Sequence, residues 1–390
     1  MTAFSKRHSM FLMQVIAELL LVGLTVSSFT LYPSLTAHAW GGNPKGFYVQ
    51  TNLVSDLPNI ARFQDPNLVN SWGLTHGPNT PWFVADNGTG LATTYNGRGR
   101  PLSIIITIPP PAGSPAGTKA APTGIVFNNV NSKNPDDFVI SANGKQGPAV
   151  FMFATEDGTI SGWNPAVDPT HAILAVDRSK VDAGAVYKGL AIGQSHQQDF
   201  IYATNFRFGT VEMFDAQFHL VKSFTDPMLS ADCPFPGQCF APFGIRNING
   251  KLFVTYALQK VGKHDDQAGP GNGFVDVFDT QGNLLSRFAS QGTLNSPWGL
   301  TLTPNNFGPF SNDLLVGNFG DGRINVFSRN GEFLGQLPDQ KGAPIIINGL
   351  WGLDFGNGRQ AGERDELFFA SGLNDEANGL FGKIQFVTER

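Results

Sequence analysis

Short apolar runs recur along most of the chain and are separated by turns rich in Gly, Asn and Asp. The clearest set lies within residues 297–334 and comprises the runs 297–302, 313–318, 323–327 and 332–334. Short runs bounded by such turns predict antiparallel strands joined by tight hairpins. We therefore expect a structural unit of four strands.

A three-residue phrase opens each unit and recurs six times, at intervals of about 50 to 65 residues. Its centre is a glycine and its third residue is aliphatic. The glycines are Gly73, Gly124, Gly189, Gly244, Gly299 and Gly352. Repeated units of four strands are the signature of a β-propeller. We predict an all-β fold, a six-bladed β-propeller of four-stranded antiparallel blades.

The last unit is incomplete, because only the segments 366–370 and 382–386 follow its opening strand. An open ring would leave an unpaired strand edge, which is a liability for aggregation. The segment 47–54 near the N-terminus has the pattern of a strand. We predict that it supplies the outer strand of the sixth blade. The wide spacing after Gly124 predicts an insertion around residues 131–147.

The unit at 297–334 resembles the NHL propeller repeat, in which Pro-x-Gly-apolar precedes an apolar-Ala-Asp/Asn turn and an Arg-Ile-x-Val-Phe strand. At the level of the whole chain, several segments are similar to a family of exported bacterial proteins of unknown function. These segments are 50–56, 65–70, 85–90 and 154–160. The resemblance spans roughly residues 47–386. It implies a propeller fold and export, and it implies no catalytic residues.

The first 39 residues differ from the rest of the chain. Basic residues at 6–8 precede an apolar run over 11–24, and Ala37-His38-Ala39 forms a small-x-small cleavage pattern. This predicts a signal peptide over 1–39, a single propeller domain over 40–390, and export to the periplasm or the extracellular medium. The alternative is an uncleaved anchor, since residues 19–39 carry no charge.

Net charge limits the expected partners, and the cysteines predict a disulfide. The chain of 390 residues has a formal net charge of −5 and no basic cluster in its sequence, which argues against binding to nucleic acid or, after signal cleavage, to a membrane. We expect a monomer. The two cysteines, Cys233 and Cys239, predict a local disulfide in an oxidising compartment. Without a nearby His pair they do not predict a zinc site.

Candidate ligand-binding residues follow from propeller geometry. The entry of each first strand and the turn between the second and third strands lie at the same end of the ring, and loops on a rigid scaffold commonly bind ligands. The candidates are Trp72, Phe243, Trp298, Trp351, Asn87, Asn205 and Asn318. The competing interpretation is structural: the aromatic residues would plug the axis, and the asparagines would shape their own turns.

Carboxylates in two longer loops raise the alternative of a metal site. Asp265, Asp266, Asp375 and Glu376 offer oxygen ligands suited to Ca²⁺, although their spacing matches no calcium-binding loop. We therefore assign no cofactor. No Gly-x-Ser-x-Gly or His-Glu-x-x-His motif is present. Metal-dependent lactonases on similar rings carry Asn, Asp or Glu on their inner strands, whereas aromatic residues dominate here.

Two functional hypotheses result from the sequence. The first is an exported, non-catalytic propeller that binds an unknown ligand or protein partner on its loop-rich face. The second is a divalent-metal-dependent hydrolase or lyase of the lactonase-like propeller type.

Overall fold

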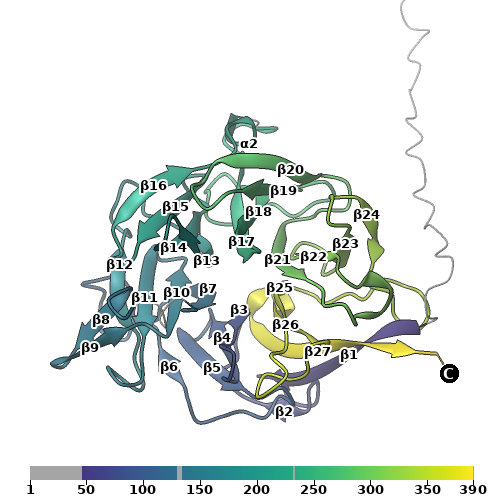
Figure 1. Cartoon of the computed structure of the whole chain (residues 1–390), viewed down its shortest axis with the longest axis horizontal. Helices are drawn as coiled ribbons and strands as arrows, with labels where there is room; N and C mark the ends of the chain where they lie inside the picture. Colours follow the sequence, from purple (N-terminus) through teal and green to yellow (C-terminus); the bar gives the residue numbers. More distant parts are fainter. Residues whose placement is uncertain (1–45, 130–133, 232, 390) are drawn as a thin grey trace, which may run out of the picture. The chain divides into compact units, whose positions relative to one another are not determined.

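The computed structural model describes residues 46–129, 134–231 and 233–389. The predicted signal peptide and its cleavage site lie outside these residues. Within them, no helix has both the length and the apolar character needed to cross a membrane. The described chain forms a closed ring of β-sheets around a central axis (Figure 1).

The predicted six-bladed propeller is confirmed, and the strands of each blade run outward from the axis. Blade one contains β3 (Ser71–Thr75), β4 (Trp82–Asp86), β5 (Leu91–Tyr95) and β6 (Ile106–Thr107). Blade two contains β7 (Pro122–Phe127), β10 (Phe151–Thr155), β11 (Thr159–Trp163) and β12 (Ile173–Asp177). Blade three contains β13 (Tyr187–Ser195), β14 (Gln198–Asn205), β15 (Thr210–Asp215) and β16 (Leu220–Phe224).

The remaining blades repeat this order. Blade four contains β17 (Phe240–Ile248), β18 (Lys251–Leu258), β19 (Gly273–Phe278) and β20 (Leu284–Ser290). Blade five contains β21 (Pro297–Leu302), β22 (Leu314–Asn318), β23 (Ile324–Phe327) and β24 (Phe333–Gln336). Blade six begins with β25 (Leu350–Phe355), β26 (Leu367–Gly372) and β27 (Asn378–Thr388). The short helices are α2 (Pro227–Ala231), α3 (Leu373–Glu376) and the 3₁₀ turn η1 (Gly308–Phe310).

The N-terminal strand β1 (Gly46–Ser55) closes the sixth blade, as the sequence predicts. It pairs antiparallel with β27, and Tyr48 lies opposite Phe386 in the register. The Tyr48 hydroxyl donates a 2.7 Å hydrogen bond to the carbonyl of Phe307 in blade five. A two-residue strand, β2 (Phe63–Gln64), adds a parallel fifth strand outside β1. The two ends of the described chain therefore lie side by side in one sheet (Figure 1).

The insertion predicted in blade two is a separate β-hairpin. Its strands, β8 (Val139–Ala142) and β9 (Lys145–Pro148), pair only with each other. The backbone N–H of Phe138 donates to the carbonyl of Ala216, and buried Ile140 packs in the core that blades two and three share. The insertion thus covers an interface between blades and leaves the four-stranded order of blade two unchanged.

The repeated glycines mark the closest approach between neighbouring blades. A Cβ atom on Gly244 would lie 2.1 Å from the carbonyl oxygen of Trp298, and one on Gly299 would lie 2.4 Å from that of Trp351. On Gly352 it would lie 2.6 Å from the carbonyl oxygen of Trp72, which joins blade six to blade one. Any larger residue would collide with the next inner strand. The close packing of neighbouring inner strands therefore requires glycine at the centre of the phrase.

Most of the buried apolar side chains lie between adjacent blades rather than within a single central core. One cluster fills each junction between neighbours, and Phe83 of blade one stacks on Phe151 of blade two at 3.9 Å. The junction between blades six and one holds Trp82, whose Nε1 donates to the carbonyl of Ala361 at 2.7 Å. Each blade is therefore stabilised mainly by contacts with its two neighbours, as in other repeat proteins.

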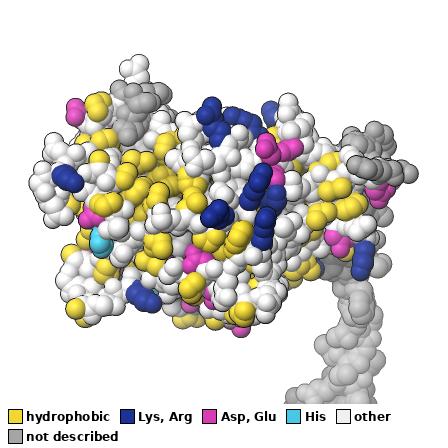
Figure 2. All heavy atoms as spheres, turned by 90° about the horizontal axis from the view of Figure 1, so that it is seen from below, with side chains coloured by type: hydrophobic (Ala, Val, Ile, Leu, Met, Phe, Trp, Pro, Cys, Tyr) yellow, Lys and Arg dark blue, Asp and Glu magenta, His cyan; other side chains and the backbone are white. Residues whose placement is uncertain are grey.

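The fold brings together basic residues that are separate in the sequence. Lys and Arg side chains gather on the edge of the ring shown in Figure 2. The turn that carries exposed Arg98 and Arg100 contacts the loop that carries exposed Arg359, because the N–H of Gly97 donates to the carbonyl of Gln360 at 2.7 Å. Basic residues that do not form a run in the sequence therefore lie close together on this surface. The expectation that nucleic acid is not a partner stays a prediction.

Candidate functional site

The two ends of the axial channel have different lining residues. The inner strands β3, β7, β13, β17, β21 and β25 all enter at one end, here called the plug end, and leave at the other, here called the mouth. The pairing of Ser71 with Asp86 and of Pro297 with Asn318 places the turns after the second strands at the plug end. All the residues proposed from the sequence for ligand or metal binding belong to the plug-end strand entries and loops.

A stack of aromatic rings closes the axis at the plug end. Trp72 and Trp351 stack with centroids 3.5 Å apart, and Phe319 stacks on Trp351 at 4.0 Å. Phe243 is fully buried and packs against Trp351 at 5.6 Å. This arrangement matches the structural interpretation of the aromatic residues. Trp298 differs, because its half-buried indole also lines the channel and donates from Nε1 to the carbonyl of Lys188 at 3.1 Å.

The plug contains one buried cation, Lys188. Its side chain is only 3% exposed, and its ammonium group pairs with Glu156 Oε1 from blade two. It also lies 5.0 Å from the centre of the Trp72 ring and 5.9 Å from that of Phe206, which are cation–π distances. Asn87 fixes the carboxylate by donating to Glu156 Oε2 at 2.8 Å. Blades one, two and three thus share this polar contact beside the axis.

A histidine and further carboxylates surround that ion pair. Possible ligand atoms of Glu156, His264 and Asp265 all lie within 4.8 Å of one another. The His264 hydrogen bond, at 2.7 Å, is the largest influence on Asp265 and lowers the pKa of that carboxyl to about 2. Burial raises the pKa of Asp266 and that of Glu376 above the ordinary carboxyl values. Of the four carboxylates proposed as metal ligands, only Asp265 belongs to this trio.

The other three proposed metal ligands occupy different surroundings. Asp266 is buried, and its Oδ2 has no hydrogen-bond partner among the described residues. Oε1 of half-buried Glu376 is likewise without a partner there. Asp375 is exposed and has a left-handed backbone conformation, with φ 51°. The four loop carboxylates proposed together from the sequence therefore differ in how far they are buried in the fold.

The proposed asparagines divide into two kinds. Asn205 is fully buried and donates to Glu212 Oε1 at 3.0 Å. Asn318 is also fully buried and donates to the carbonyl of Thr293 at 2.8 Å and to Asp321 Oδ1 at 3.0 Å. Both amides act within their own blades, as the turn-geometry interpretation expects. Asn87 is half-buried and reaches the neighbouring blade through Glu156.

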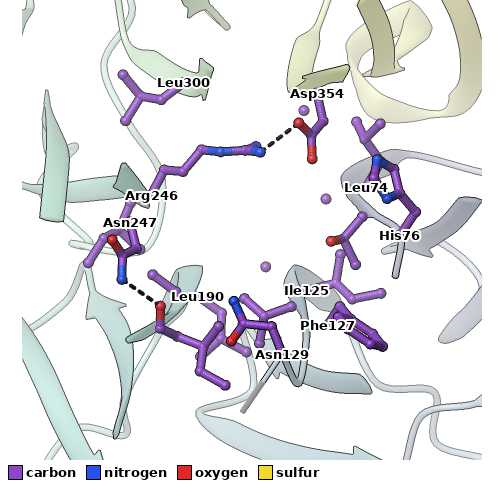
Figure 3. A pocket seen from close by; sticks show the side chains of 18 of the residues that line it. Leu74, His76, Ile125, Phe127, Asn129, Leu190, Arg246, Asn247, Leu300 and Asp354 are labelled. Atoms are coloured by element: carbon purple, nitrogen blue, oxygen red, sulfur yellow. Dashed lines mark hydrogen bonds and ion pairs between the residues drawn. The ribbon is translucent and has the colours of Figure 1, made fainter. Parts of the chain in front are cut away.

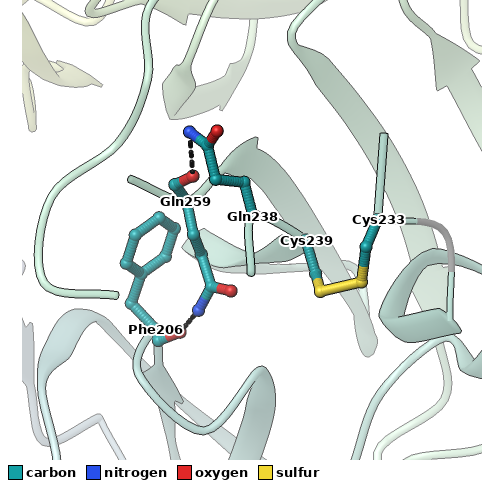
Figure 4. Close-up of a disulfide and its surroundings, with 5 residues drawn as sticks. All are labelled: Phe206, Cys233, Gln238, Cys239 and Gln259. Carbon is teal, nitrogen blue, oxygen red and sulfur yellow. Dashed lines mark hydrogen bonds between the residues drawn. A yellow bond between two sulfur atoms is a disulfide. The ribbon is translucent and has the colours of Figure 1, made fainter. Parts of the chain in front are cut away.

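Cys233 and Cys239 form the predicted disulfide, in the loop that leads into β17 (Figure 4). Gln238 inside this loop donates to the carbonyl of Gln259 at 3.1 Å. The side chain of Gln259 in turn donates to the carbonyl of Phe206, which packs in the aromatic plug. The disulfide loop is thereby linked to the plug through two glutamine side chains.

The mouth end opens into a cavity of about 830 Å³ along the axis. Its wall includes one aliphatic residue from each blade, the third residue of the repeated phrase, whose side chain also belongs to the buried cluster at a junction between blades. These are Leu74, Ile125, Leu190, Ile245, Leu300 and Leu353, and Figure 3 shows Leu74, Ile125, Leu190 and Leu300 around the opening. Trp298 also lines the cavity, and its ring packs edge-on against Trp72 and Trp351 of the plug, with centroids 6.2 and 5.7 Å apart. The cavity volume lies in the range of small-molecule sites.

Polar side chains gather above the aliphatic ring, toward the mouth. Arg246 of blade four reaches across blade five to Asp354 of blade six, with 2.6 Å between the guanidinium and the carboxylate oxygen Oδ1 (Figure 3). The guanidinium also donates to the carbonyl of Leu353 at 3.2 Å. His76 Nε2 lies 2.8 Å from the carbonyl oxygen of Phe355. The lining of the cavity therefore includes both aliphatic and charged residues.

Sequence reasoning missed the residues of this rim, although one signal was present. The position two residues after each repeat glycine holds Thr75, Val126, Ala191, Arg246, Thr301 and Asp354. Only two of these six are charged, and their charges are opposite. That contrast could have identified Arg246 and Asp354. The plug pair Glu156 and Lys188 had no comparable signal, because it joins an inner strand to a turn in the preceding blade.

Comparison with known proteins identifies relatives of viral origin. No protein-family model matches the chain. Uncharacterized protein R648 of Acanthamoeba polyphaga mimivirus is 32% identical over 85% of this chain and 78% of its own length. Uncharacterized protein L690 of the same virus is 30% identical over 85% of this chain and 84% of its own length. The chain belongs to the family of these uncharacterized proteins. The relatives found are viral, which corrects the expectation of a bacterial family.

Solved structures support the same fold. Virginiamycin B lyase from Staphylococcus aureus superimposes with a TM-score of 0.50 and 14% sequence identity, over 88% of this chain and all of the lyase chain. A streptogramin B lyase structure gives a TM-score of 0.50 at 13% identity, over 88% of this chain and 98% of its own. Identities this low indicate shared architecture. They do not carry the lyase activity to this chain.

Proposed function

We propose that this protein is an exported, non-catalytic propeller that binds a ligand with an apolar body in its axial channel, entering from the mouth. The observation that carries the proposal is the 830 Å³ cavity, whose lining includes one aliphatic residue from each blade together with Trp298. A concave site of this size that combines apolar residues with a few polar groups is the usual form of a small-molecule site. Loops at the plug end offer a second surface for a protein partner, as the sequence suggested.

The plug end has a different role in this proposal. Trp72, Phe243 and Trp351 are buried against one another, so a ligand could reach them only if the plug opened. We assign them to closing the channel and keep Trp298 as the aromatic residue that faces the ligand. Burial of aromatic rings in such a stack favours rigidity, which suits the closed end of a binding cavity.

Binding of the uncharged dye N-phenyl-1-naphthylamine tests the proposal. The dye is expected to gain fluorescence on binding to the wild-type protein and to quench Trp298. Leu190→Trp should obstruct the channel and abolish this binding, with its unfolding temperature verifying that the junction between blades two and three is intact, whereas Phe235→Trp places an indole on an exposed loop and should leave binding unchanged. Equal binding by Leu190→Trp and wild type would contradict a site in the channel.

Export is tested separately. N-terminal sequencing of protein recovered from the periplasm or the medium should give Trp40 as the first residue. An intact N-terminus on membrane-bound protein would support the uncleaved anchor instead.

A metal-dependent hydrolase or lyase remains the second candidate, because Glu156, His264 and Asp265 place three possible ligands close together. One imidazole and two carboxylates suit a transition metal better than Ca²⁺, which prefers oxygen ligands. The Lys188 ammonium already pairs with Glu156 Oε1 and would compete with a metal there. Thermal unfolding of the purified protein with Mn²⁺, Ca²⁺ or EDTA tests this candidate. A metal-dependent stabilisation lost in Asp265→Asn but kept in Asp375→Asn would support it.

A further inference from the structure

The charged groups at the mouth suggest which ligands the channel selects. Four ionisable side chains line the cavity: His76, Arg246, Asp354 and Arg364. Two are arginines and one is a carboxylate, although the whole chain carries a formal net charge of −5. The cavity is therefore locally more basic than the protein that contains it. A charged lining in a low-dielectric opening concentrates ligands of the opposite sign.

Arg246 is held in place from one side and open on the other. Its guanidinium donates to Asp354 Oδ1 at 2.6 Å and to the carbonyl of Leu353 at 3.2 Å, and these are its only acceptors among the described residues. A guanidinium has five N–H groups, so three remain available. The Arg246 side chain is 34% exposed, whereas that of Asp354 is 14% exposed. The carboxylate is thus largely covered while the guanidinium faces the cavity.

Asp354 has the role of a fixed support for this arginine. Its Oδ1 also accepts the backbone N–H of Phe355 at 2.8 Å, which holds the carboxylate on β25. An arginine restrained in this way loses less side-chain entropy when it binds a second anion. Arg364 adds an exposed guanidinium on the same opening, with no carboxylate partner in the described part of the chain.

We infer that the ligand of the channel is an amphipathic anion, whose acidic group binds Arg246 at the mouth and whose apolar body lies against the aliphatic ring. This inference rests on the proposed function and adds the chemical class of the ligand. Arg246 follows Ile245 of the aliphatic ring directly along β17, so the two binding regions are a few ångströms apart. A carboxylate, sulfonate or phosphate can all accept the N–H groups that remain on a guanidinium.

A pair of dyes with the same ring system tests the inference. 8-Anilinonaphthalene-1-sulfonate differs from N-phenyl-1-naphthylamine by its sulfonate, so the ratio of their dissociation constants measures selection for an anion. Arg246→Gln should weaken binding of the sulfonate dye by about tenfold to a hundredfold. It should change binding of the uncharged dye by less than about twofold, since the aliphatic wall is intact.

Asp354→Asn should change the affinity for the sulfonate dye in the opposite direction. The Asn side-chain oxygen can still accept from Arg246 and hold it in place, while the opposing negative charge is lost, so binding of the sulfonate dye should become a few times tighter. Arg359→Gln is the matched control, because it removes one exposed arginine from the loop that carries Arg364 without removing a cavity residue. It should alter the ratio of dissociation constants by less than about twofold. Unfolding temperatures of all three variants verify that they are folded.

Displacement of the bound dye identifies the acidic group. Decanoate and decyl phosphate should compete, and decanol should compete at least tenfold less well. If the uncharged dye binds in the channel but Arg246→Gln leaves the sulfonate dye unaffected, the inference is wrong and the proposed function stands. If neither dye binds, or Leu190→Trp fails to block them, both are wrong.

Discussion

The two ends of the channel are built from the same six strands, yet one end is closed and the other is open. At the plug end, the residue before each repeat glycine is aromatic at four of the six positions, and three of these aromatic side chains are buried together. At the mouth, the residue after each glycine is an aliphatic side chain on the cavity wall. The glycine between them sets the blade spacing. One tripeptide repeat therefore provides the closure, the ring contact and the cavity wall at successive positions.

The ion pairs at the two ends of the channel also differ, because the pair at the plug end is more deeply buried than the pair at the mouth. Lys188 and Glu156 are 3% and 12% exposed, whereas Arg246 and Asp354 are 34% and 14% exposed. Removing one partner of a buried ion pair destabilises a fold strongly, because it leaves the other charge buried and unpaired. A partly exposed ion pair contributes little to stability. The plug pair should therefore affect stability, and the mouth pair should affect ligand binding.

The largest effect is expected for Lys188→Met. This change leaves the Glu156 carboxylate without its cation and removes the cation–π contact with Trp72, so the free energy of unfolding should fall by about 3 to 5 kcal/mol. Arg246→Met at the mouth should lower it by less than about 1 kcal/mol. Urea unfolding measures both values. Similar losses at the two ends would remove the distinction between them.

A smaller loss is expected for Gly299→Ala. The new methyl group would lie 2.4 Å from the carbonyl oxygen of Trp351, so the blades must separate, at a cost of about 1 to 3 kcal/mol. Gly262→Ala is the control, since no atom lies within 4 Å of a Cβ there. Thermal unfolding should show a lower midpoint for Gly299→Ala alone. An unchanged midpoint would mean that the glycines do not set the ring contact.

A pH-dependent effect should appear at Asp266 of the plug end. Burial raises the pKa of Asp266 in the folded protein, so protonation of this carboxyl favours folding and its contribution to stability is lost as pH rises. Asp266→Asn should match wild type in acid and become the more stable protein at higher pH. Asp375→Asn, at an exposed position, should follow wild type throughout. Urea unfolding between pH 4 and pH 8 distinguishes the two variants.

The same variant also distinguishes the metal hypothesis. A divalent cation bound by Asp266 would keep the carboxylate ionised and favourable, so Asp266→Asn would then be the less stable protein in the presence of that metal. Repeating the urea series with Mn²⁺ or Ca²⁺ provides this measurement.

The periodic features of the chain were predictable from sequence, because each repeat carries the same physical requirement. Gly244 and its equivalents repeat because neighbouring blades make the same close contact at each junction. Tyr48 belongs to the strand that pairs with the otherwise unpaired edge of the sixth blade. The candidate site was less predictable. Arg246 meets Asp354 across an intervening blade, so the pairing depends on how far each side chain reaches into the channel.

The plug-end assignments show the same limit. Trp298 and Trp351 look alike in sequence, yet only Trp298 lines the cavity. Asn318 holds the position of Asp86 in the repeat and is satisfied inside its own blade, whereas Asn87 stands one residue later in its turn and donates to Glu156 of the next blade. A repeat pattern fixes the backbone position of such residues. The directions of their side chains depend on neighbours that the repeat does not conserve from blade to blade.

A crystal structure of the protein soaked with N-phenyl-1-naphthylamine would show directly where an apolar ligand binds. Dye density is expected in the channel, beside Trp298 and the aliphatic ring that includes Leu74 and Leu190, with the plug unchanged. Density at the plug end beside Glu156 and His264, with an empty channel, would contradict this expectation.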